Sequence, residues 1–233
     1  MSEPQSIGEV LTDIKPLRQK QAQERLEWED DRAKRERCGR LMDLARDTGP
    51  RLDPHKVCTL PLYEIYHKDQ TAIVAKVQEW VDHAQDNIRT GAGMIVIGRR
   101  GTGKDHLCIS AAREAIRTCE VSARWVDGRD LFRTALDDVR GEGGGNSLRE
   151  YMHAGILILS DPIQPGIALR DYQQDALWRI VNHRYQKCLP TFVTSNCKDL
   201  PEFEKGIGTA MLSRLRHNAT MVLCNWPDYR ERK

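Results

Sequence analysis

The sequence contains no run of 18 or more apolar residues, which excludes a membrane-spanning helix and gives no reason to expect a membrane partner. The N-terminus lacks the apolar core of a signal peptide, so the sequence predicts a cytoplasmic protein. None of the seven cysteines forms a CxxC pair, which favours reduced thiols over a zinc ribbon or a disulfide framework. The formal net charge is only +2, so any surface that binds nucleic acid must be a local one.

The first quarter of the chain differs in composition from the rest. Residues 1–14 carry no strong pattern, which predicts disorder. Charged residues of both signs alternate from Lys15 to Arg40, which predicts a long, solvent-exposed helix. That helix is either a docking segment for a partner protein or a solvated spacer. Turn-forming residues near positions 48–54 then mark a boundary, so we expect a helical extension over 1–56 and one globular domain over 57–233.

Strand-like and helix-like segments alternate after residue 57. This alternation predicts an α/β fold with a mostly parallel sheet flanked by helices. A glycine-rich run at 141–145 is expected to be an exposed, flexible loop. The expected strands cover 94–97, 121–126, 155–159, 191–195 and 220–224, and the expected helices cover 73–88, 104–118, 129–140 and 172–185, with two short ones flanking Gly206 and Gly208.

A phosphate-binding motif lies between the first of these strands and the helix that follows it. Glycines in such a loop let successive backbone N–H groups face an anion, and the helix N-terminus adds partial positive charge. Lys104 is expected to reach the outer phosphates of ATP or ADP. Position 105 departs from the pattern, because an aspartate stands where a Ser or Thr hydroxyl would coordinate Mg²⁺. The predicted nucleotide-binding residues are Gly98, Arg99, Arg100, Gly101, Thr102, Gly103, Lys104, Asp105 and His106.

The apolar stretch Ile156–Leu159 supplies the second element that an ATPase needs. The usual pattern places an acidic residue directly after four apolar ones, but here Ser160 stands there and Asp161 follows. Usually a hydroxyl follows the loop lysine and a carboxylate ends the strand. In this sequence the two groups are exchanged between positions 105 and 160, so the total set of metal ligands stays the same. We hypothesise that Asp105, Ser160 and Asp161 hold Mg²⁺ and that Asp161 polarises the attacking water. Two alternatives stay open: a degenerate site that binds nucleotide weakly without hydrolysis, and an alignment in which Asp161 itself is the metal ligand.

Asn196 ends the strand Thr191–Ser195 and offers a polar side chain beside the γ-phosphate, although Ser and Asn also favour ordinary turns. These pieces, in this order, resemble the bacterial helicase loaders of the DnaC/DnaI type and the related IstB transposition ATPases, which are AAA+ P-loop proteins. Four further stretches carry the resemblance, which covers about residues 60–233: Val126–Leu131, Asn182–Tyr185, Leu212–Leu215 and Asp228–Arg230.

The resemblance implies roles for three residues outside the loop. Asn196 corresponds to the sensor-1 residue, and Arg230 to the sensor-2 arginine that contacts the nucleotide. Arg214 corresponds to the arginine finger, which acts on a neighbouring subunit's nucleotide and implies self-association. A surface arginine that contacts DNA phosphates beside Arg216 is the alternative for Arg214. The first 60 residues match no zinc-binding pattern of the DnaI kind, so helicase docking through Lys15–Arg40 is only an analogy.

The implied function is slow, partner-stimulated ATP hydrolysis by a DNA replication protein that assembles on single-stranded DNA and a replicative helicase. A transposition helper of the IstB kind shares every motif and differs only in its partner. A catalytically inactive nucleotide-binding adaptor is the third possibility, because Asp105 departs from the metal-binding pattern.

Overall fold

The computed structural model describes residues 7–141 and 148–232, in two compact units, Met1–Gly39 and Arg40–Lys233. Helix α1 (Ile7–Thr48) belongs to both units. It begins at Ile7, so the predicted disorder is wrong for residues 7–14, while residues 1–6 lie outside the described part of the chain. Ion pairs four residues apart, such as Arg25–Glu29 and Arg32–Glu36, line its exposed surface, which confirms the predicted charged helix.

The globular unit begins at Arg40 rather than at residue 57. The last turns of α1 belong to it because Leu44 is fully buried and Asp47 binds the edge of the sheet. The Asp47 carboxylate accepts hydrogen bonds from Arg124 Nε at 2.6 Å and from the backbone N–H of Trp125 at 3.1 Å. An edge strand exposes unpaired N–H groups, and Asp47 satisfies one of them.

Five parallel strands form one sheet in the order β2-β3-β4-β1-β5, which confirms the predicted α/β class. Two strands coincide with their expected ranges, and the other three end one residue later than expected. Strand β1 lies between β4 and β5, so the loop that follows it emerges beside the ends of these two strands. The strands are β1 (Met94–Gly98), β2 (Ala123–Asp127), β3 (Ile156–Ser160), β4 (Thr191–Ser195) and β5 (Thr220–Cys224).

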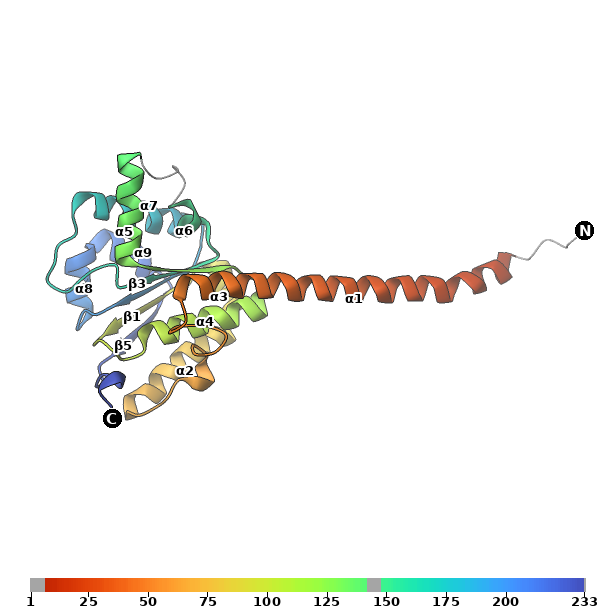
Figure 1. Cartoon of the computed structure of the whole chain (residues 1–233), viewed down its shortest axis with the longest axis horizontal. Coiled ribbons are helices and arrows are strands. Elements are labelled where there is room, and N and C mark those ends of the chain that lie inside the picture. The colour runs from red at the N-terminus through yellow and green to blue at the C-terminus, as the bar shows by residue number, and fades with distance from the viewer. Residues whose placement is uncertain (1–6, 142–147, 233) are drawn as a thin grey trace, which may run out of the picture. The chain divides into compact units, whose positions relative to one another are not determined.

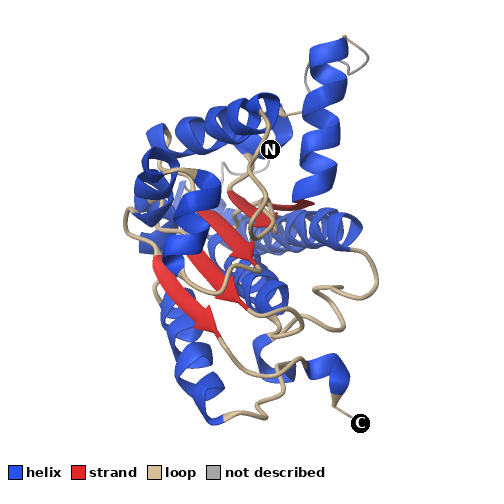
Figure 2. Cartoon of the chain, turned by 90° about the vertical axis from the view of Figure 1, so that its left-hand side faces the viewer, coloured by secondary structure: helices blue, strands red, loops and turns tan. Residues whose placement is uncertain are grey.

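Helices cover both faces of the sheet, with α2 and α4 on one side and α5, α7 and α9 on the other (Figure 1, Figure 2). The helix expected over 73–88 is two helices, because His83 leaves the helical conformation between them. The predicted glycine-rich loop falls outside the described residues from 142 onward. The remaining helices are α2 (Lys68–Asp82), α3 (Ala84–Thr90), α4 (Lys104–Cys119), α5 (Gly128–Arg140), α6 (Arg149–His153), α7 (Asp171–Gln186), α8 (Leu200–Ile207) and α9 (Thr209–Arg216), with 3₁₀ turns η1 (Leu60–Leu62) and η2 (Tyr229–Glu231).

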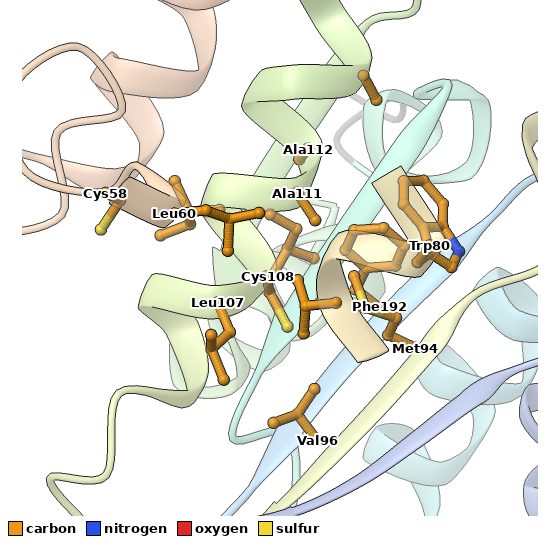
Figure 3. Close-up of a cluster of buried hydrophobic side chains, with 14 of the residues drawn as sticks. Cys58, Leu60, Trp80, Met94, Val96, Leu107, Cys108, Ala111, Ala112 and Phe192 are labelled. Carbon is orange, nitrogen blue, oxygen red and sulfur yellow. The ribbon is translucent and has the colours of Figure 1, made fainter. Parts of the chain in front are cut away.

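Alternate residues of the central strands feed two separate cores. Met94 and Val96 of β1 face α2 and α4, where the Trp80 ring meets the Phe192 ring edge-on at 4.9 Å between centroids (Figure 3). Ile95 and Ile97 face the helices of the opposite side. Every residue of β1, β3 and β4 is buried, as expected for strands covered on both faces. Two rigid cores therefore hold the carboxyl ends of these strands in register.

Candidate functional site

The phosphate-binding loop joins β1 to α4 and has the backbone that the motif requires. Gly101 and Gly103 have φ of 69° and 84°, a left-handed region that other residues rarely adopt. A Cβ at Gly101 would collide with the Asp228 carboxylate, and one at Gly103 would lie 2.7 Å from the Tyr63 ring. Gly103 is the N-cap of α4, so the loop leads directly into the helix N-terminus.

Lys104 is the first residue of α4, and its side chain folds back under the loop. Its ammonium donates to the carbonyls of Gly98 at 3.1 Å and Arg99 at 2.9 Å, and to Asn196 Oδ1 at 2.8 Å. Burial lowers the pKa of Lys104, and the negative charges of Asp161 and Asp105 oppose that shift. The lysine is therefore fixed at the junction of the loop and the end of β4.

Asn196 connects this lysine to Asp161. Its Nδ2 donates to Asp161 Oδ2 at 2.6 Å, so the three residues predicted from separate motifs form one hydrogen-bonded row. Asp161 has φ of 45°, and its Oδ1 is buried without a hydrogen-bond partner among the described residues. Burial raises the pKa of the Asp161 carboxyl, and the Lys104 charge opposes the rise.

Asp105 and Ser160 lie in contact, as their exchange in the sequence suggests. Burial raises the pKa of the Asp105 carboxyl, and hydrogen bonds from the Ser160 and Thr194 hydroxyls act in the opposite direction. The Thr194 hydroxyl donates to Asp105 Oδ1 at 3.0 Å. The hydroxyl at the end of β3 thus lies beside the carboxylate at the start of α4, at the carboxyl ends of the parallel strands.

Two observations indicate that these residues suit a nucleotide and a divalent cation. The loop has the left-handed glycine backbone of a phosphate-binding loop and leads directly into the N-terminus of α4, whose N–H groups favour an anion. Asp161 Oδ1 is a buried carboxylate oxygen to which no described residue donates a hydrogen bond, and a cation would satisfy it. Within the described residues no group of three or more His, Cys, Asp or Glu side chains gathers, but Mg²⁺ at nucleotide sites commonly takes only one or two carboxylates together with phosphates and water.

A cleft of about 670 Å³ opens beside the loop. It is wide enough for a nucleotide, since ligand pockets commonly have volumes of ~300–1,000 Å³. Its lining combines apolar and aromatic side chains with several Lys and Arg side chains. Arg230, for which the sequence predicts a contact with the nucleotide, lines the cleft, but its guanidinium is paired with Asp228 at 2.7 Å. The lining comprises Arg51, Leu52, Lys56, Val57, Leu62, Tyr63, Glu64, Tyr66, Arg100, Gly101, Thr102, Gly103, Lys104, Asp105, His106, Asp161, Asn196, Tyr229 and Arg230.

Among the remaining predicted nucleotide-binding residues, Arg99 and Arg100 have exposed side chains on the loop. The Thr102 hydroxyl donates to the Arg99 carbonyl at 2.8 Å and so closes the loop on itself. His106 packs edge-on against Tyr63, and its Nε2 lies 3.0 Å from the Thr59 carbonyl oxygen. His106 therefore stabilises the wall of the cleft.

Arg214 does not line this cleft; it lies on α9. Its guanidinium stacks on the Trp178 ring, with Cζ 4.2 Å from the ring centroid. Its Nε donates to Asn182 Oδ1 at 3.0 Å and its Nη1 to the Ala210 carbonyl at 2.9 Å. The side chain is thus held in one orientation, away from the nucleotide site of its own chain.

Sequence reasoning overlooked Tyr63 and Trp226 as parts of the site. Both side chains donate a hydrogen bond to the carbonyl of Thr102, in the middle of the loop. For Trp226 a signal existed, because it follows β5, and the end of a strand paired with β1 must lie near the loop. For Tyr63 no local pattern marks the contact, since it comes from the segment before α2.

Among the described residues, no helix is both long enough and apolar enough to cross a membrane. The family profile named "IstB-like ATP binding protein" matches residues 51–233 of the chain. The replicative helicase loader DnaC of Escherichia coli K12 is 25% identical over 182 residues, which cover 76% of this chain and 71% of that protein.

Solved structures share the fold at lower sequence identity. The DnaC helicase loader has a TM-score of 0.65 at 18% identity and covers 72% of this chain and 96% of its own. DnaI has a TM-score of 0.63 at 20% identity, with 75% and 94% covered. The replication initiator DnaA bound to AMPPCP and single-stranded DNA has a TM-score of 0.58 at 18% identity, with 73% and 50% covered. The chain therefore has the fold that these solved structures share.

Proposed function

Because the chain belongs to the IstB-like ATP-binding protein family, we propose that it is a cytoplasmic AAA+ ATPase that places a replicative helicase on single-stranded DNA. The observation that carries the ATPase part is the hydrogen-bonded row Lys104–Asn196–Asp161, which links the phosphate-binding loop to the acidic end of β3. The similarity to the DnaC helicase loader supports the choice of partner.

In this proposal each residue has a defined task. The loop N–H groups and Lys104 bind the phosphates, and Asn196 holds Lys104 and Asp161 at a fixed separation. Asp161 orients the attacking water and accepts its proton, which a raised pKa favours. Asp105, Ser160 and Asp161 would hold Mg²⁺, which when bound neutralises charge on the phosphate oxygens. Arg230 would reach the nucleotide after leaving Asp228.

The metal site is tested by exchanging the two positions. Asp105→Thr and Ser160→Asp are each expected to lower ATP turnover about 10–100-fold, because one removes a carboxylate and the other adds a third beside two others. The double variant restores one hydroxyl and one carboxylate, so we expect turnover to recover toward the wild-type rate. The Mg²⁺ concentration required for half-maximal binding of a nonhydrolysable ATP analogue should rise in each single variant and return toward the wild-type value in the double variant. A double variant no more active than either single one would contradict the exchange.

The partner is tested by capture. Tagged protein, loaded with ATP, is expected to retain a purified replicative helicase and not a transposase. ATP turnover should rise when single-stranded DNA is added, and DNA binding should weaken as salt increases, because local Lys and Arg side chains displace counterions. Capture of the transposase alone would assign the protein to transposition, the alternative raised by the resemblance to the IstB ATPases. Nucleotide binding without any turnover would instead indicate an inactive adaptor.

A further inference from the structure

The carbonyl of Thr102 receives two hydrogen bonds from side chains distant in the sequence. Tyr63 Oη donates at 2.8 Å and Trp226 Nε1 at 3.1 Å. Both side chains are buried, at 9% and 1% exposure, so neither donor exchanges readily with water. Two donors on one carbonyl of a glycine-rich loop fix the direction in which that carbonyl points.

The direction matters because the peptide bond is planar and trans. The N–H of Gly103 therefore points opposite to the carbonyl of Thr102. With that carbonyl turned toward Tyr63 and Trp226, the Gly103 N–H faces the other way. The preceding peptide, Gly101–Thr102, is also fixed in its orientation, because the backbone N–H of Tyr229 donates to the Gly101 carbonyl at 2.9 Å. Glycines on both sides of Thr102 would otherwise let these peptides rotate and present a carbonyl oxygen to a phosphate.

The orientation of the Tyr63 hydroxyl is itself fixed by the N-terminus of α2. Gln70 Oε1 accepts the backbone N–H groups of Tyr66 and His67, each at 2.7 Å. Its amide nitrogen must then point the other way, and it donates to Tyr63 Oη at 3.3 Å. Since the tyrosine oxygen accepts from Gln70, its own proton is directed to Thr102.

We propose that Tyr63 and Trp226 are positioning residues that hold the Thr102–Gly103 peptide with its N–H toward the phosphates of a bound nucleoside di- or triphosphate, and that Gln70 sets the direction of the Tyr63 hydroxyl. The inference rests on the proposed function, because it assigns these residues to phosphate binding. It concerns the polyphosphate alone and leaves the base unaffected.

Tyr63→Phe keeps the ring and removes the donor. We expect the dissociation constants of ADP and of inorganic pyrophosphate, measured by calorimetry, to rise by the same factor of about ten, the worth of one such hydrogen bond. The control is Tyr151→Phe, which removes a partly buried hydroxyl on α6 and should change neither constant. If the hydroxyl has only a structural role, its removal will lower the urea midpoint of the nucleotide-free protein and leave both dissociation constants unchanged. That result would overturn the proposal.

Gln70→Glu is the second variant. It keeps an acceptor for the Tyr66 and His67 N–H groups but offers the Tyr63 hydroxyl proton a carboxylate in place of the Thr102 carbonyl. The affinities for ADP and for pyrophosphate should therefore fall as they do in Tyr63→Phe. Loss of ADP affinity with unchanged pyrophosphate affinity in either variant would overturn the inference by assigning the effect to the base. A wild-type protein that binds neither ligand would overturn the proposed nucleotide site and, with it, this inference.

Discussion

Arg214→Ala is expected to lower ATP turnover of the assembled protein by about 10³–10⁵-fold, the contribution of an arginine finger to stabilising charge in phosphoryl transfer. Nucleotide binding by the separate chain should stay unchanged, because Arg214 does not line the cleft of its own chain. The measurement is steady-state turnover at concentrations where the protein self-associates, together with calorimetric binding of ADP. Arg216→Ala, at an exposed position of the same helix, is the matched control.

A mixing experiment decides whether the finger acts between chains. Lys104→Ala removes nucleotide binding and Arg214→Ala removes the finger, so each variant alone should be inactive. In a head-to-tail assembly of both, some interfaces combine an intact Lys104 with a neighbour's intact Arg214, and turnover should recover to roughly a quarter of the wild-type level. No recovery in mixed assemblies, or loss of ADP binding by Arg214→Ala alone, would contradict the role. Weakened DNA binding with normal turnover would support the DNA-contact alternative.

Arg184→Leu is expected to destabilise the protein by roughly 3–5 kcal/mol, a large part of the stability of most domains. Arg184 is fully buried on α7, and all the acceptors of its guanidinium among the described residues are neutral. Leucine would leave several of these carbonyls buried without a donor. The acceptors are the carbonyls of Tyr151, Met152, Ala154, Gly155 and Pro190 and the hydroxyl of Thr191, at 2.6–3.4 Å.

The reason for this contact lies in the short helix α6. Its last carbonyls have no intrahelical partner, and the Arg184 guanidinium supplies both donors and positive charge at that end. Urea unfolding of the nucleotide-free protein measures the loss. Arg179→Leu, exposed on the same helix, should change stability by no more than ~0.5 kcal/mol. An Arg184→Leu midpoint equal to that of the control would refute the assignment.

The sequence is sufficient for the elements that local patterns encode. The strands 191–195 and 220–224 have the bounds that the sequence predicts, although the first is buried along its whole length and the second, at the edge of the sheet, is only partly buried. The split of the helix over 73–88 was missed, since its apolar spacing continues through His83 and only the backbone there departs from the helix.

The candidate site divides in the same way. That Lys104, Asn196 and Asp161 meet follows from sequence alone, since parallel strands bring their carboxyl ends to one edge. The contact between Asp105 and Ser160 follows from the same rule. The strand order then decides the neighbours: β1 lies between β4 and β5, so the loop meets Asn196 on one side and the segment around Trp226 on the other.

The sequence by itself thus determined the fold class, the phosphate-binding loop and the acidic and polar strand ends, because each is written in neighbouring residues. Only the tertiary structure decided that Tyr63 and Trp226 hold the Thr102 carbonyl, that Arg184 caps α6, and that Arg214 stacks on Trp178. These contacts join residues far apart in the chain through single donors and acceptors. No periodicity records such pairs, since what selects them is the need of each buried polar group for a partner.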